Sequence, residues 1–262
     1  MPTAQELVQK WDLFLAKIET RFAETLQQAE DASVELLQDS DYDYNKTMQA
    51  FTGMKRQIED LIQKIDLTWD EKVRPRMEDA FESTEWVNES IKGGNLSSVL
   101  WDKLREFEVV LEGKLSQMYY EHVITIVDKD FRCSQCNAQL EIVKNLFRSQ
   151  YVTCSYCDTV NTFKPETKYT HIGWGIVDNI VNLKFLEEKK ALHKDLDQLK
   201  ELVQSKKATP QDWENYKTAY TNFWEMYFKE RIKYNSELKD RFAEDMQRKT
   251  DELNEFKQQT TF

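Results

Sequence analysis

Apolar residues recur every three or four positions over most of the chain, which is the spacing of one face of an α-helix. In the first stretch this repeat consists of Leu7, Trp11, Phe14, Ile18, Phe22 and Leu26. Thr3 and Glu6 precede it with the spacing of a capping box, whose two side chains satisfy free backbone N–H groups. The pattern predicts an amphipathic helix that begins near Thr3.

Further helices are predicted after the acidic segment 39–43, which we expect to be a loop. The repeat resumes with Met48, Phe51, Ile58, Leu61, Ile62 and Ile65. Thr68 and Glu71 repeat the capping signature before another helix, in which Pro75 marks a kink or the first turn. Gly93 and Gly94 predict the end of that helix, and residues 97–122 predict the next one.

The spacing changes to that of short strands between Val123 and Lys168. Four runs there are rich in β-branched and aromatic residues and short enough for strands: Ile124–Val127, Leu140–Val143, Tyr151–Thr153 and Thr159–Phe163. This part of the chain is therefore predicted to be a small β insert between helical regions.

Helical spacing returns near His171 and continues to about Lys206. Thr209, Pro210 and Asp212 then predict a new helix start, because threonine caps, proline suits the first turn and aspartate favours the positive helix end. An aromatic stripe follows without an internal Gly or Pro, and it consists of Trp213, Tyr216, Tyr220, Phe223, Tyr227, Tyr234, Leu238, Phe242, Leu253 and Phe256. If continuous to residue 257, this helix would be about 70 Å long, at about 1.5 Å per residue, and would need partners along its length.

These patterns divide the chain into an N-terminal helical region (1–122), the β insert (123–168) and a C-terminal helical region (169–262). The predicted fold is mainly α, with long amphipathic helices in a bundle or an antiparallel coiled-coil-like arrangement. Short connections make sequential helices neighbours, so we expect the C-terminal helices to pack on the N-terminal ones. A homodimer would bury the same apolar stripes, and the pattern does not separate these two arrangements.

Composition and charge restrict the kinds of binding partner expected for this chain. The 262 residues include six Gly and four Pro, and 32% are charged, which suits long solvent-facing helices. The formal net charge of -11 opposes general attraction to phosphate backbones or anionic membranes. No stretch approaches the roughly 18 consecutive apolar residues of a membrane span, and the first ten residues lack the features of a signal peptide. We expect a cytoplasmic protein without a membrane span.

The four cysteines of the chain form two pairs, Cys133-x2-Cys136 and Cys154-x2-Cys157, separated by seventeen residues. This spacing predicts one tetrathiolate site for Zn²⁺, because each tight turn directs two sulfurs to one ion. Four thiolates complete the tetrahedron and leave no position for water, so the zinc is expected to be structural rather than catalytic. Rubredoxin-like iron uses a similar ligand set and is the alternative metal.

Residues 131–137 (Phe-Arg-Cys-Ser-Gln-Cys-Asn) and 152–158 (Val-Thr-Cys-Ser-Tyr-Cys-Asp) resemble the two knuckles of the zinc ribbon family. The resemblance covers about residues 128–165 and implies that the four cysteines are the ligands. Asn137 and Asp158 stand where the knuckles commonly have glycine, and both residue types tolerate a left-handed backbone. Many members of the family recognise nucleic acid or proteins.

Other candidate sites are weaker. His122, His171 and His193 lie outside known catalytic or metal-binding motifs. Asp39, Asp41 and Asp43 lack the glycine and the terminal glutamate of an EF-hand loop. The chain is therefore expected not to be an enzyme.

The sequence favours a non-enzymatic protein-interaction or scaffold protein, in which a helical bundle presents a structural zinc ribbon to a protein partner. The alternative is a nucleic-acid-associated zinc ribbon protein. That alternative needs a basic face, for which the insert offers Arg132, Lys144, Arg148, Lys164 and Lys168.

Overall fold

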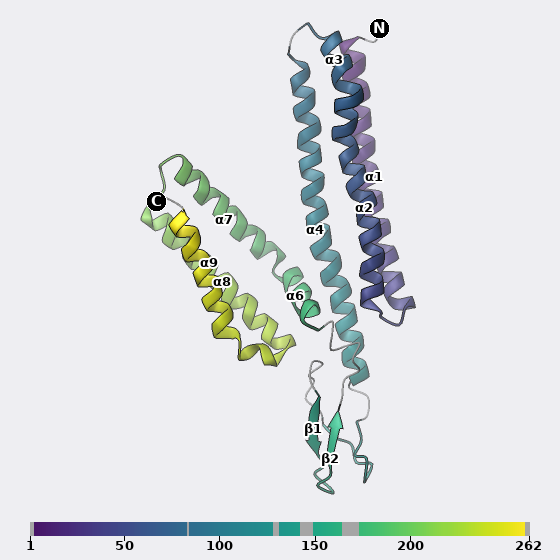
Figure 1. Cartoon of the computed structure of the whole chain (residues 1–262), viewed down its shortest axis with the longest axis vertical. Helices are drawn as coiled ribbons and strands as arrows, with labels where there is room; N and C mark the ends of the chain where they lie inside the picture. Colours follow the sequence, from purple (N-terminus) through teal and green to yellow (C-terminus); the bar gives the residue numbers. More distant parts are fainter. Residues whose placement is uncertain (1–2, 83, 128–130, 142–148, 164–172, 260–262) are drawn as a thin grey trace. The chain divides into compact units, whose positions relative to one another are not determined.

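The computed structural model describes residues 3–82, 84–127, 131–141, 149–163 and 173–259. It is mainly α with one small antiparallel sheet of two strands, which confirms the predicted fold class (Figure 1). The chain divides into two compact units, Met1–Leu111 and Glu112–Phe262. Helix α4 (Trp86–Val127) contributes residues to both units.

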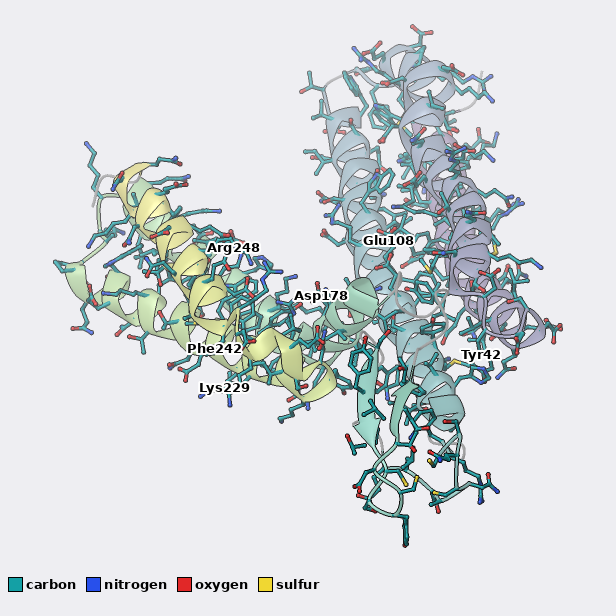
Figure 2. All side chains as sticks on the ribbon, turned by 60° about the horizontal axis from the view of Figure 1, so that its bottom comes forward. Tyr42, Glu108, Asp178, Lys229, Phe242 and Arg248 are labelled. Carbon is teal, nitrogen blue, oxygen red and sulfur yellow. The ribbon has the colours of Figure 1, made fainter. Side chains whose placement is uncertain are left out.

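The first unit is built from long helices. Its elements are α1 (Ala4–Asp39), α2 (Tyr44–Thr68), a π-helical turn (Trp69–Val73), α3 (Arg74–Ala80) and the first part of α4 (Trp86–Val127). Helices α1 and α2 lie side by side (Figure 1), and Lys55 of α2 forms an ion pair with Glu108 of α4, labelled in Figure 2. The core includes Trp11, Ile18, Phe22, Phe51, Ile58, Ile62, Ile65, Leu100 and Leu104.

Local capping explains where the first two helices begin. The Thr3 hydroxyl accepts from the Glu6 N–H, and the Glu6 carboxylate accepts from the Thr3 N–H at 2.9 Å, so the predicted capping box is present. Asp41 and Tyr42 have positive φ angles of 53° and 58°, and they turn the chain after α1. The Asp43 carboxylate then accepts from the Lys46 N–H at 3.0 Å and starts α2. The predicted loop at 39–43 is therefore confirmed, apart from its first residue, which ends α1.

Pro75 lies in the first turn of α3, one of the two positions predicted for it, but the predicted cap before it is absent. Thr68 makes no side-chain cap, and the helix that begins at Tyr44 continues through it to Ala80. Because proline has no N–H and its ring crowds the preceding turn, an α-helical turn is costly before Pro75. The backbone widens instead, and the Arg74 N–H donates to the Trp69 carbonyl across a π-helical turn.

The predicted helix end at Gly93 and Gly94 is wrong, since α4 runs through both residues to Val127. Gly93 is buried against α1, and a Cβ there would lie 2.7 Å from Cζ2 of Trp11. The Trp11 indole N–H also donates to the Glu89 carbonyl at 3.1 Å. Gly93 therefore permits close contact between two helices and does not end one.

Two of the four predicted strands are present. β1 (Gln150–Thr153) and β2 (Val160–Phe163) form an antiparallel pair in which Tyr151 faces Thr162 and Thr153 faces Val160. The strand predicted at 124–127 is wrong, because these residues continue α4. Of the run 140–143, residues 140–141 are not in a strand, and 142–143 lie outside the described residues.

The second unit contains an aromatic helical core. Its helices are α6 (Gly173–Lys184), α7 (Leu186–Gln204), α8 (Pro210–Tyr234), a 3₁₀ turn (Ser236–Lys239) and α9 (Phe242–Gln259). The predicted cap is confirmed, because the Thr209 hydroxyl accepts from the Asp212 N–H. Helix α8 packs on α6, α7 and α9, and the core includes Val181, Phe185, Leu199, Trp213, Phe223, Tyr227, Phe228 and Leu253.

The single helix considered for residues 210–257 is broken at Asn235. The Asn235 side chain accepts from the Glu237 N–H at 3.1 Å, which stabilises a local turn in place of a continuing helix. Helix α9 then folds back on α8, so that Phe256 stacks on Trp213 with ring centroids 6.2 Å apart. The aromatic stripe is therefore partly covered within its own unit.

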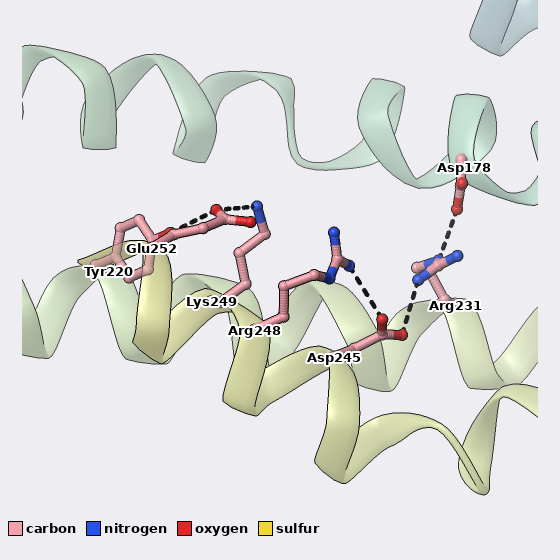
Figure 3. Close-up of polar contacts among 7 residues, drawn as sticks. All are labelled: Asp178, Tyr220, Arg231, Asp245, Arg248, Lys249 and Glu252. Atoms are coloured by element: carbon pink, nitrogen blue, oxygen red, sulfur yellow. Dashed lines mark hydrogen bonds and ion pairs between the residues drawn. The ribbon is translucent and has the colours of Figure 1, made fainter. Parts of the chain in front are cut away.

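Charged side chains connect three helices of this unit (Figure 3). Arg231 of α8 forms ion pairs with Asp178 of α6 at 2.6 Å and with Asp245 of α9 at 3.4 Å. Arg248 also pairs with Asp245, at 3.0 Å. The side chains of Arg231 and Asp245 are 12% and 7% exposed, whereas those of Asp178 and Arg248 are 41% and 58% exposed, so only the central Arg231–Asp245 pair lies largely away from water.

Candidate metal centre

The first cysteine pair lies in a tight turn held by its own backbone. The Asn137 N–H donates to the Cys133 carbonyl at 3.0 Å, and the Cys133 N–H donates to the Ala138 carbonyl at 2.8 Å. Asn137 has a φ of 57°, the left-handed conformation expected for this position. The turn brings Cys133 and Cys136 onto the same side of the chain.

The second pair repeats this geometry. The Asp158 N–H donates to the Cys154 carbonyl at 2.9 Å, and the Cys154 N–H donates to the Thr159 carbonyl at 2.9 Å. Asp158 also has a φ of 57°. The two cysteine pairs therefore lie in equivalent turns, as the sequence predicts, although neither turn contains glycine.

The turns bring all four predicted ligands together. The four sulfur atoms lie within 4.8 Å of one another, with Cys133 Sγ 3.5 Å from Cys157 Sγ and Cys136 Sγ 3.5 Å from Cys154 Sγ. A regular tetrahedron with Zn–S bonds of about 2.3 Å has sulfur–sulfur edges of about 3.8 Å. The arrangement is therefore suited to a metal ion between the sulfurs, and the cysteines are free thiols rather than disulfides.

The apolar core around the cysteines is small. Cys133, Leu140 and Cys154 are its buried residues, with Phe131 and Val152 packed against them. A core of this size supplies little hydrophobic stabilisation, and metal binding commonly contributes the missing folding free energy in such modules. Cys136 is exposed and Cys157 half-buried, so the sulfur cluster has one side toward solvent.

Hydrogen bonds favour the thiolate at two of the sulfurs. The backbone N–H groups of Cys136 and Gln135, followed by the Asn161 side chain, lower the pKa of Cys133 to about 6. The Thr159 hydroxyl and backbone N–H lower the pKa of Cys157. Cys154 Sγ accepts from the Tyr156 N–H at 3.5 Å, as Cys133 Sγ does from the Gln135 N–H.

Cys136 has the opposite shift. The backbone N–H of Ala138 lowers its pKa, but hydrogen bonding with the thiols of Cys157, Cys154 and Cys133 outweighs this effect and raises the pKa to about 12. Several thiolates this close repel one another unless a cation lies between them. The donor set therefore fits a divalent, thiophilic ion such as zinc.

Asn161, which is buried in β2 beside the cluster, was not predicted from the sequence. Its Oδ1 accepts from the backbone N–H and the hydroxyl of Ser134, at 2.8 and 2.9 Å. Its Nδ2 donates to the Thr159 carbonyl at 3.0 Å and reaches Cys133 Sγ at 3.6 Å. The only sequence signal was a polar residue at an inward-facing position of a predicted strand.

The remaining sequence candidates do not gather into a second cluster. His122 is in α4 and His193 is exposed in α7, whereas His171 lies outside the described residues. Asp43 caps α2. Within the described ranges, the four cysteines are the one group of His, Cys, Asp or Glu residues placed to hold a metal ion.

Arg132 is the one basic residue of the proposed basic face that lies within the described residues, where its guanidinium donates to the Asn137 carbonyl at 3.3 Å. The other four lie outside them. No helix of the part described has the length and apolar character needed to cross a membrane. Comparisons with protein-family models, with curated proteins and with solved structures found no match to this chain.

Proposed function

We propose that this is a non-enzymatic interaction or scaffold protein, in which a structural zinc ion stabilises a small recognition module carried by helices. The observation that carries the proposal is the four-sulfur cluster, in which Cys133, Cys136, Cys154 and Cys157 lie at distances suited to one tetrahedral ion. With four protein ligands no coordination position is left for substrate or water, so the metal would supply stability and not Lewis-acid chemistry.

The exposed face of the β1–β2 hairpin favours a protein as the partner. Tyr151 and Val160 are 78% and 60% exposed, and they share this face with Thr153 and Thr162 because directly paired residues point to the same side of a sheet. None of the four residues is charged. Tyr156, in the second turn, is 80% exposed. Exposed aromatic residues are enriched at protein interfaces, where they supply much of the binding energy.

A nucleic-acid-associated function is the second candidate, and the same two tyrosines favour it. Exposed aromatic rings stack on unpaired bases without reading sequence. The net charge of -11 opposes this alternative, because phosphate contacts dominate the affinity of such complexes. Binding of this kind would weaken steeply as salt increases.

Copurification with a tagged full-length chain from its native host, with and without nuclease, tests the proposal. Three forms are compared: the natural chain, the double variant Tyr151→Ser/Tyr156→Ser, and Leu13→Ser as a control that removes an exposed apolar side chain from α1. We expect a discrete protein partner that survives nuclease and Leu13→Ser but is lost in the tyrosine variant. Partners that disappear with nuclease would favour the nucleic-acid alternative instead.

A further inference from the structure

The two cysteine turns are equivalent position by position, with the second offset from the first by 21 residues. Cys133 corresponds to Cys154, and Cys136 corresponds to Cys157. The bridge between Arg132 and Gln139 corresponds to the pairing of Thr153 with Val160 in the strands. The correspondence extends one residue further, where it places Leu140 opposite Asn161. At this position one turn has a buried apolar side chain and the other a buried amide.

Asn161 uses this position to connect the two turns. The residue is 5% exposed, and its carbonyl oxygen accepts both the backbone N–H and the hydroxyl of Ser134, which belongs to the first turn. Its amide nitrogen donates to the Thr159 carbonyl of the second turn. A buried amide with all these partners satisfied has one orientation available. Asn161 therefore fixes the distance between the first turn and β2.

The same amide nitrogen reaches Cys133 Sγ at 3.6 Å, within hydrogen-bonding range for sulfur. No side chain outside the four cysteines, among the residues described, donates to Cys136 Sγ, which is also exposed to solvent. Outer hydrogen bonds orient metal ligands and stabilise their charge. The sulfurs therefore differ in their environment. Cys133 is buried and accepts a side-chain hydrogen bond from Asn161, whereas Cys136 is exposed and, among the residues described, accepts none from a side chain outside the cysteines.

We propose that Asn161 is a positioning residue for the metal site. Asn161 holds Cys133 in the cluster, whereas Cys136 remains the ligand that exchanges most readily. This inference rests on the proposed four-cysteine metal site and extends it to the stability of the bound ion. Asn161 acts through Cys133 and Ser134 and does not contact the metal itself.

Metal-binding measurements on the full chain test this role with Zn²⁺ and Co²⁺ as probes. Asn161→Asp keeps an acceptor for Ser134 but loses the N–H donor to Cys133, and Asn161→Leu copies the residue at position 140. We expect either variant to lower metal affinity about 10- to 100-fold, the usual effect of losing an outer-shell partner. Ser134→Ala, the matched control, removes one hydroxyl donor and should change affinity less than either.

The Co²⁺ spectrum distinguishes a positioning role of Asn161 from an effect of the substitution on folding. Loss of the N–H donor leaves more electron density on Cys133 Sγ, so the sulfur-to-metal charge-transfer band of Asn161→Asp should move to lower energy, with helical circular dichroism unchanged. An Asn161→Asp protein with natural affinity and an unshifted band would overturn the inference. Failure of the natural chain to bind either ion would instead remove the proposed metal site itself, so the two failures are distinguishable.

Limited alkylation of the Zn²⁺-loaded chain with iodoacetamide gives an independent test. Each reaction forms a sulfur–carbon bond and releases iodide, and peptide mapping identifies which cysteine reacted. We expect Cys136 to react first and Cys133 late in the natural chain, and Asn161→Asp to raise the rate at Cys133 relative to that at Cys154. Equal rates at Cys133 and Cys136 in the natural chain would contradict the proposed inequality.

Discussion

Gly93 of α4 lies directly against the indole ring of Trp11 in α1, so closely that a Cβ at position 93 would come 2.7 Å from Cζ2. Trp11 is 1% exposed and its N–H is bonded to the Glu89 carbonyl, one turn before Gly93. The ring therefore has little freedom to move away. The absence of a side chain at position 93 is what allows these two helices to meet.

The adjacent glycines give a matched pair of substitutions. Gly93→Ala should destabilise the chain by about 1–3 kcal/mol, because overpacking outweighs the gain in helix propensity. Gly94→Ala, with nothing within 4 Å of its Cβ position, should stabilise by about 0.5–1 kcal/mol. Urea unfolding followed by circular dichroism measures both. Equal effects of the two substitutions would contradict the described contact.

Features set by nearby residues were predictable from the sequence. The capping box at Thr3, the cap at Thr209, the loop after α1 and the left-handed backbone at Asn137 and Asp158 follow from local chemistry and are present, whereas the capping signature at Thr68 and Glu71 forms no cap. Such features depend on residues only a few positions apart. The meeting of the two Cys-x2-Cys turns, 21 residues apart, was predictable for a different reason, because one tetrahedral ion needs four ligands.

Features set by distant contacts were not predictable. The local sequence at Gly93 predicts a helix end, because the contact of Gly93 with Trp11 exists only in the folded chain. The β-branched run 124–127 favours a strand locally, but it continues α4. Asn161 carries no recognisable motif, since its role depends on Ser134, 27 residues earlier in the chain. In each case the deciding partner lies far away in the sequence or outside the local segment.

Arg231 should be the most sensitive charged residue of the second unit. Arg231→Met removes the cation that Asp178 shares with the buried Asp245 and leaves Asp245 paired with Arg248, so we expect a loss of about 2–3 kcal/mol in unfolding free energy. Lys229→Met, which removes an exposed pair with Glu225, should cost less than about 1 kcal/mol. Denaturant unfolding of both variants measures the difference, and similar losses would argue against the buried network.

Two buried tyrosines of α8 differ in their hydrogen bonding. The Tyr227 hydroxyl donates to Asn182 Oδ1 at 3.1 Å, so Tyr227→Phe should cost about 1 kcal/mol at neutral pH. The Tyr216 hydroxyl has no hydrogen-bond partner among the described residues, and Tyr216→Phe should change stability by less than about 0.5 kcal/mol. A larger loss for Tyr216→Phe than for Tyr227→Phe would contradict this assignment.

Stability should fall in alkaline solution. Burial, and then the charge of Asp195, raises the pKa of Tyr216 to about 12, and burial also raises the pKa of Tyr220 and Tyr227. A raised pKa in the folded chain favours the neutral phenol, so this stability is complete below the ordinary value of about 10 and is lost as pH rises above it.

Tyrosinate absorbance and helical circular dichroism, recorded together, measure this effect. These tyrosines should ionise as helix is lost, and Tyr216→Phe should move the transition to higher pH. Ionisation of all tyrosines near pH 10 with the helices intact would contradict the burial described.

Metal removal should affect the insert far more than the helices. The aromatic core of the second unit contains none of the cysteines or their apolar neighbours. A strong chelator should therefore abolish the dispersed amide NMR signals of residues 131–141 and 149–163, while most helical circular dichroism remains. Loss of helix in parallel with zinc would show that the insert and the helices fold as one unit, against this expectation.

The metal content of the purified chain is the most direct test of the four-cysteine centre. The full chain, purified without added metal or chelator, is analysed for bound zinc and iron, beside four variants that each replace one cysteine with serine. We expect one zinc per natural chain, a Co²⁺-substituted form with the intense absorption of tetrahedral thiolate coordination, and weaker binding in all four variants. A natural chain without stoichiometric metal, or cysteine variants that bind it as tightly, would contradict the four-cysteine centre.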